Sequence, residues 1–134
     1  MDYPTIHSRT TEWLRQARYD LETAEAMQAG GRHIYAVFMC HLAVEKALKG
    51  LYSMRLQEIP PKSHSLSLLL TKLESSRPPE EIGRFIFRLS EASIPTRYPD
   101  DLAKAQVDYS QEVAADIIGK AREAVSWIES QLLN

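Results

Sequence analysis

Residues 41–50 read HLAVEKALKG and lie within a longer stretch whose apolar residues recur at helical spacing. The apolar stripe of this stretch consists of Val37, Val44, Leu48 and Leu51. We expect a helix over residues 32–56, which Pro60 and Pro61 prevent from continuing. The stripe is predicted to be buried in the core, with Cys40 and Ala47 in its narrower positions.

Further segments of the chain are amphipathic, and none alternates as a half-buried strand would. One covers roughly residues 9–29 and ends at Gly30-Gly31, and a short one is expected to be capped by Ser63. Another surrounds Phe85. The last, with Asp108 or Ser110 as its cap, repeats Val113, Ile117, Ala121, Val125, Ile128 and Leu132. The prediction is an all-α bundle of about five helices, in one domain over residues 1–134.

The composition restricts the class of protein. The 134 residues carry a formal net charge of −2, so no overall positive field points to nucleic acid, although a local basic patch is compatible with this charge. Cys40 is the only cysteine, which excludes an internal disulfide framework and a cysteine-based zinc site. No long apolar run or signal-peptide pattern occurs. We therefore expect a cytoplasmic protein that is neither exported nor membrane-spanning.

The sequence offers no pattern for a metal or a cofactor. His33 and His41 have no neighbouring cluster of carboxylates or cysteines, and no HExxH spacing occurs. Gly30-Gly31 stands alone between two helices and is not a phosphate-binding glycine loop. We expect no metal and no cofactor.

Three polar residues of the opening stretch fall in one line along the predicted helix. His41, Glu45 and Lys49 are spaced at i, i+4 and i+8, between Phe38 and Tyr52. One interpretation is a solvated helix face with an ordinary ion pair. The other is a partly covered groove or subunit seam, in which a paired charge orders a neighbouring loop.

Three stretches together resemble the HEPN family, named for its occurrence in higher eukaryotes and prokaryotes. They are FMCHLAVEKALKGL (38–51), PPKSHSLSLL (60–69) and RYP (97–99), followed by an apolar-periodic last helix. The positions that match the family pattern are Ala43, Glu45, Lys46, Ala47 and Lys49, then Pro61, Ser63, His64 and Leu66, then Arg97, Tyr98 and Pro99. The resemblance covers nearly the whole chain.

The resemblance implies a compact antiparallel helical bundle, commonly a homodimer, that acts on or around RNA and nucleotides. Many family members are metal-independent endoribonucleases that serve as toxins, and others are encoded with a small nucleotidyltransferase that acts as the antitoxin. Single-stranded RNA or a nucleotide is thus the implied ligand. The candidate binding residues are Arg97, Tyr98, Lys46, Lys49, Glu45, His41 and His64.

The family's cleavage motif, Arg followed after four to six residues by His in the C-terminal half, is absent. The histidines are at positions 7, 33, 41 and 64, and none follows. No catalytic residue is therefore assigned, and whether the protein is an enzyme stays open. Three functions are considered: a nucleotide- or RNA-binding half of a toxin–antitoxin-like pair, which we favour; a noncanonical ribonuclease using Arg97 with His64; and a structural dimerisation module.

The stretch TRYPDD (96–101) is the second candidate region. Pro99 is expected to start a helix, which would leave Arg97 and Tyr98 extended before it. Arg97 then either forms an ion pair with Glu45 or contacts a phosphate while Tyr98 stacks on a base. We predict the ion pair, with Lys49 close by, because a buried unpaired glutamate would be costly.

Overall fold

The computed structural model describes residues 6–73 and 76–132, which form seven helices and no strand. The helices are α1 (Ile6–Ala29), α2 (His33–Leu56), α3 (Leu66–Lys72), α4 (Glu80–Glu91), α5 (Ser93–Arg97), α6 (Leu102–Asp108) and α7 (Gln111–Gln131). The predicted all-α bundle is confirmed. The short helix α5 includes Arg97, which was expected to be extended, and the short helix α6 follows the stretch 96–101.

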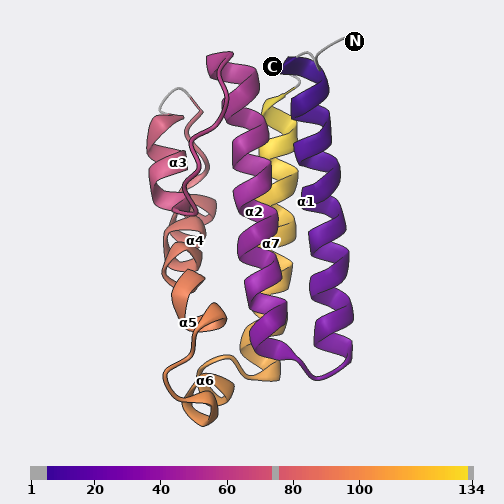
Figure 1. The fold of residues 1–134 in the computed structure, drawn as a ribbon, viewed down its shortest axis with the longest axis vertical. Helices are drawn as coiled ribbons and strands as arrows, with labels where there is room; N and C mark the ends of the chain where they lie inside the picture. The colour runs from indigo at the N-terminus through magenta and orange to yellow at the C-terminus, as the bar shows by residue number, and fades with distance from the viewer. Residues whose placement is uncertain (1–5, 74–75, 133–134) are drawn as a thin grey trace.

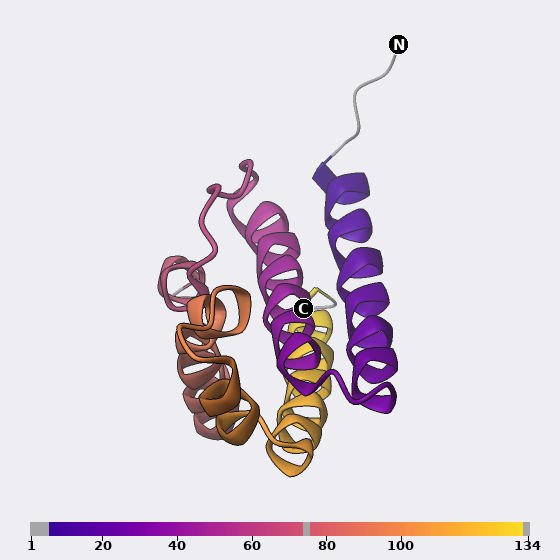
Figure 2. The same ribbon diagram turned by 60° about the horizontal axis from the view of Figure 1, so that its bottom comes forward.

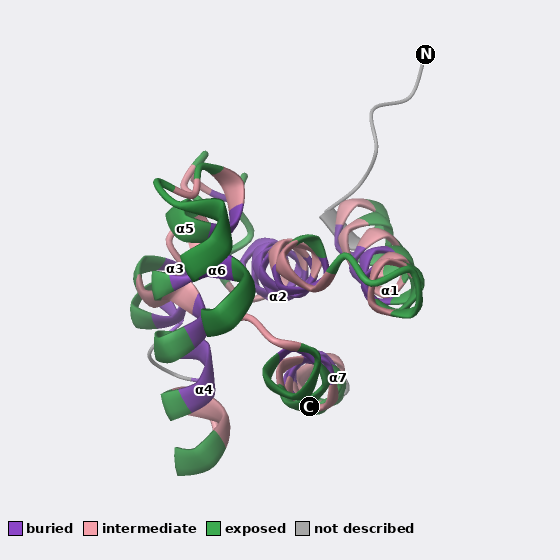
Figure 3. Ribbon diagram, turned by 90° about the horizontal axis from the view of Figure 1, so that it is seen from below, coloured by how far each residue is buried: buried purple, intermediate pink, exposed green. Residues whose placement is uncertain are grey.

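Helix α2 is the centre of the bundle. Helices α1 and α7 run alongside it, and α3 to α6 lie on its other side (Figures 1 and 3). A helix with neighbours on both sides has little surface left for solvent, and the predicted apolar stripe from Val37 to Leu51 is fully buried. Polar side chains on α2 are therefore also forced into contact with protein.

Helices α1 and α2 approach most closely at Gly50. A Cβ atom at this position would lie 3.1 Å from the Cβ of Trp13 and 3.4 Å from the carbonyl oxygen of Thr10. The hydroxyls of Thr10 and Ser53 form a buried hydrogen bond of 2.8 Å beside this contact. A glycine is favoured here because a side chain would require α1 and α2 to move slightly apart.

Side-chain caps correct several predicted helix starts. Ser65, not Ser63, caps α3 by accepting a hydrogen bond from the N–H of Leu68. Asp101 caps α6 in the same way, so that helix begins after Pro99 and not at it. Of the two predicted caps of the last helix, Asp108 and Ser110, it is Ser110 that caps α7.

The first part of the last helix presents a different face from the one predicted. Val113 is exposed, whereas Ala114 and Ile118, each one position further along, are buried. The buried face of α7 is therefore shifted by one residue at the start of the helix. Helices α5 and α6 lie on the same side of α2 as α4 (Figure 2). Among the described residues, no helix is long and apolar enough to cross a membrane.

Candidate functional site

The carboxylate of Glu45 is buried on α2 and binds two positively polarised groups. Only 3% of the residue is exposed. Its Oε2 accepts a hydrogen bond from Nζ of Lys49 at 3.0 Å, one helical turn further along. Nδ1 of His64 lies 3.0 Å from Oε2 and 3.1 Å from Oε1. The solvated-face interpretation is therefore wrong, and the interpretation as a partly covered groove that orders a loop agrees with the structure.

His64 connects the segment between α2 and α3 to Glu45. Because a carboxylate can only accept, Nδ1 of His64 carries the proton of this hydrogen bond. The side chain is 58% exposed, so the other side of the ring faces solvent. When the ring is neutral, its Nε2 is a free acceptor held in a fixed orientation by a buried carboxylate. Such an arrangement can move a proton to or from a ligand.

His41 is completely buried one turn before Glu45. Its Nδ1 lies 3.8 Å from Oε1 of Glu45, beyond hydrogen-bonding distance, and neither ring nitrogen forms a hydrogen bond with a described residue. Burial lowers the pKa of His41 from 6.5 to about 4. Glu45 opposes this shift in pKa, while the charges of Arg97 and His64 add to it. His41 is consequently neutral at physiological pH.

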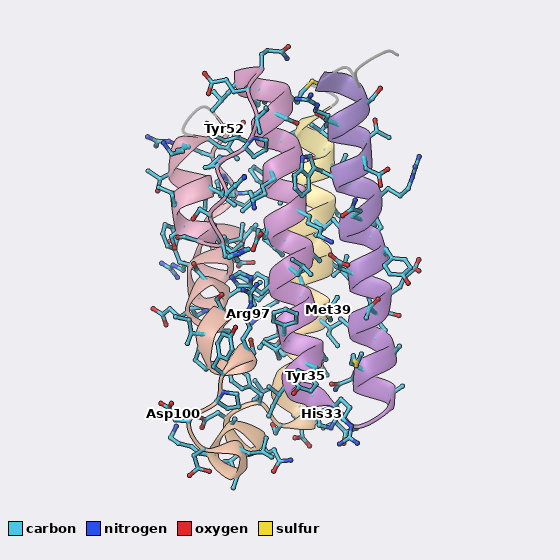
Figure 4. The ribbon with its side chains drawn as sticks, in the orientation of Figure 1. His33, Tyr35, Met39, Tyr52, Arg97 and Asp100 are labelled. Carbon is cyan, nitrogen blue, oxygen red and sulfur yellow. The ribbon has the colours of Figure 1, made fainter. Side chains whose placement is uncertain are left out.

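The predicted ion pair between Arg97 and Glu45 is wrong. Arg97 is the last residue of α5, and its guanidinium carbon lies 4.8 Å from the centre of the Phe38 ring on α2. Among the described residues no carboxylate forms a salt bridge with Arg97, and its buried Nε has no hydrogen-bond partner. A guanidinium stacks well on an aromatic face, so Phe38 holds it without neutralising it. Figure 4 shows Arg97 between α5 and α2.

An open face surrounds Arg97. It is a shallow hollow of about 450 Å³ lined by Tyr35, Phe38, Thr96, Arg97 and Tyr98. The two tyrosines are 55% and 75% exposed. Thr96 is buried and donates a hydrogen bond to the carbonyl of Ala92, which fixes the end of α5. We call these five residues the aromatic face.

The two lysines among the candidate residues do not reach the aromatic face. Nζ of Lys46 lies 3.0 Å from a carboxylate oxygen of Asp20, so this side chain points toward α1. Lys49 is buried between Glu45 and the ring of Trp13, whose centre lies 5.8 Å from its Nζ. Lys46 and Lys49 therefore serve the packing of α1 on α2. In the part of the chain that the structure describes, no group of His, Cys, Asp or Glu is placed to hold a metal.

Tyr35 is a member of the aromatic face that was not among the candidates predicted from the sequence. It lies three residues before Phe38, so both rings project from the same side of α2 (Figure 4 labels Tyr35). The spacing of these aromatic residues was visible in the sequence, but the partner helix α5 was not. Tyr98 is the residue that caps the C-terminus of α5, and Arg97 is the last residue of that helix, so the expected extended conformation of the pair is wrong.

We compared the sequence and the fold of this chain with those of known proteins. The sequence matches the HEPN domain over residues 10–131. The chain belongs to the HEPN domain family. The crystal structure of TT1696 from Thermus thermophilus is similar, with a TM-score of 0.80 and 31% identity over 91% of this chain and 97% of that one. No curated protein matches the chain significantly.

A second solved structure agrees with this assignment. It is ST0689, described as an archaeal HEPN homologue, with a TM-score of 0.74 and 32% identity over 92% of this chain and 97% of that one. In the present HEPN protein the stretches that carry the resemblance meet in space. Glu45 of α2 binds His64 of the following loop, and both His64 and Arg97 act on the buried His41.

Proposed function

We propose that this HEPN protein binds a nucleotide or single-stranded RNA at the aromatic face and does not cleave it. The observation that carries the proposal is Arg97, a half-buried cation that no carboxylate of the described chain neutralises. A phosphate is an anion that a planar guanidinium binds well.

The exposed rings beside Arg97 supply the second requirement for a nucleic-acid ligand. Tyr35 and Tyr98 present ring faces on which bases can stack, a contact worth about 1–3 kcal/mol per base. The hollow is shallow and open, which suits a single-stranded segment better than a deeply enclosed small molecule.

The wider role follows from the family. We propose that the protein is a homodimer and one half of a toxin–antitoxin-like pair with a small nucleotidyltransferase. The absence of a histidine after His64 supports binding without cleavage, since the family's Arg–His cleavage motif cannot be formed in this sequence. Binding and partnership thus require no reaction at the site.

The test is the fluorescence anisotropy of a labelled oligouridylate titrated with protein in the presence of a chelator. Arg97→Gln and Tyr98→Ala are each expected to weaken binding roughly tenfold or more. Arg15→Gln is the matched control, because Arg15 is an exposed arginine on α1, away from α5. Equal affinity of Arg97→Gln and Arg15→Gln would reject the proposal.

One observation favours a second function, a noncanonical metal-independent ribonuclease. His64 is exposed and oriented by a buried carboxylate, which is how histidine is prepared for proton transfer. Under this alternative, single-stranded RNA incubated with chelator is cut, and both His64→Ala and Arg97→Ala abolish the cutting. Intact RNA after prolonged incubation with the wild-type protein rules it out and agrees with the favoured function.

A further inference from the structure

Two buried polar groups near the aromatic face lack protein partners. Both ring nitrogens of His41 and the Nε of Arg97 form no hydrogen bond within the described residues. They come from α2 and α5, which pack against each other. Buried polar groups are almost always hydrogen-bonded. Arg97 lines the hollow and His41 lies about one helical turn after Phe38, which also lines it, so a ligand at Arg97 would change the surroundings of His41.

The charged groups around His41 influence its pKa, and a bound ligand would change their effect. The groups that act on His41 are Glu45 from its own helix, Arg97 from α5 and His64 from the segment before α3. Glu45 is already shared between Lys49 and His64 and lies 3.8 Å from His41. Arg97 and His64 disfavour a proton on His41, as does burial, which holds its pKa at about 4.

We propose, on the basis of the nucleotide-binding function above, that the ligand's phosphate binds Arg97 and that His41 takes up a proton as it binds. An anion at Arg97 cancels the repulsion that Arg97 exerts on a charged His41, so a proton on His41 costs less free energy in the complex. The complex then holds more protons than the free protein. Binding must therefore strengthen as the pH falls.

The size of the effect follows from the change in the His41 pKa. Neutralising a like charge nearby raises a histidine pKa by about one pH unit. Starting from a pKa of about 4, this makes the affinity about twofold higher at pH 5 than at pH 7. A ligand that itself titrates would obscure this dependence.

The probe is a short oligouridylate, because neither its bases nor its phosphodiesters gain or lose a proton in this range. Calorimetric titrations in two buffers of different ionisation enthalpy are expected to show proton uptake near pH 5. In His41→Gln, the ratio of the affinity at pH 5 to the affinity at pH 7 is expected to fall to about one, whatever the affinity at pH 7. The control variant Arg15→Gln on α1 should keep the increase in affinity at pH 5. If His64→Gln lost this increase while His41→Gln kept it, the proposal would be overturned.

A measurement on the wild-type protein covers the case in which His41→Gln does not fold. In protein with isotope-labelled histidine rings, NMR titration is expected to show the His41 pKa rising when saturating oligouridylate is added. An unchanged His41 pKa with the oligouridylate bound overturns only the proton uptake. No binding at any pH overturns the nucleotide-binding function itself, and the proton uptake with it.

Discussion

Glu45 shows how one buried residue organises its surroundings. A carboxylate removed from water needs partners of opposite charge or hydrogen-bond donors, and Glu45 obtains both from Lys49 and His64. One partner comes from the same helix and the other from the loop after it. The residue thus fixes the loop on α2.

Removing Glu45 alone is expected to be strongly destabilising. In Glu45→Ala, the buried Lys49 loses its counter-charge, and the free energy of unfolding should fall by about 3–5 kcal/mol. Urea denaturation measures this. Glu22→Ala, an exposed glutamate on α1, is the control and should change stability by less than about 0.5 kcal/mol. A loss below about 1 kcal/mol for Glu45→Ala would mean that its ion pair behaves as a surface one.

The titration of His41 predicts that acid destabilises the ligand-free protein. Burial keeps the pKa of His41 at about 4 in the folded chain, against 6.5 ordinarily, so between these values the unfolded chain binds a proton that the folded chain does not. Stability is therefore lost as the pH falls through this window, by about 3 kcal/mol in total.

Urea denaturation at a series of pH values tests this dependence. His41→Leu removes the titrating ring, and its free energy of unfolding should fall less steeply between about pH 6.5 and pH 4 than that of the wild type. Parallel slopes for the two proteins would show that His41 is not responsible for the acid sensitivity.

At the residue scale, the sequence predicted that Glu45 needs a partner but named the wrong one. The spacing left open whether the line of His41, Glu45 and Lys49 is solvated or covered, and the structure buries all three residues. The competition between Lys49, His64 and Arg97 for one carboxylate depends on where α5 and the loop before α3 lie. Arg97 stacks on the ring of Phe38 and does not contact Glu45.

At the scale of elements, α2 determines the arrangement because neighbours cover it on several sides. Its core stripe was predictable, since helical periodicity fixes which residues share a face. Helix α5 was not predictable in the same way. Pro95 lies within the first turn of α5, where a proline removes no helical hydrogen bond, so its presence does not exclude a helix.

The contact between α1 and α2 predicts opposite effects for two glycine substitutions. Gly50→Ala places a Cβ 3.1 Å from the Cβ of Trp13, so the helices must separate and the protein should lose about 1–3 kcal/mol. Gly119→Ala adds a methyl group in open space on α7 and should stabilise by up to about 1 kcal/mol. Thermal denaturation compares them, and equal melting temperatures would contradict the close approach.

At the scale of the whole molecule, we predict a homodimer. Besides Tyr98 of the aromatic face, helices α5 and α6 carry three strongly exposed apolar side chains, Ile94, Leu102 and Val107, and exposed apolar side chains close together in the chain suit a protein–protein interface. Size-exclusion chromatography with light scattering measures the mass directly. A measured mass close to the 15.3 kDa of one chain, at protein concentrations of tens of micromolar, would contradict the prediction.

The central claim is that a phosphate-bearing ligand binds where α5 meets α2. NMR chemical-shift mapping with a short oligouridylate tests it most directly, since every backbone amide reports on its own surroundings. We predict that the largest changes occur at the aromatic face, from Tyr35 and Phe38 to Arg97 and Tyr98, and that the RNA stays intact. Changes confined to α1 and α7, or no changes at saturating RNA, would contradict it.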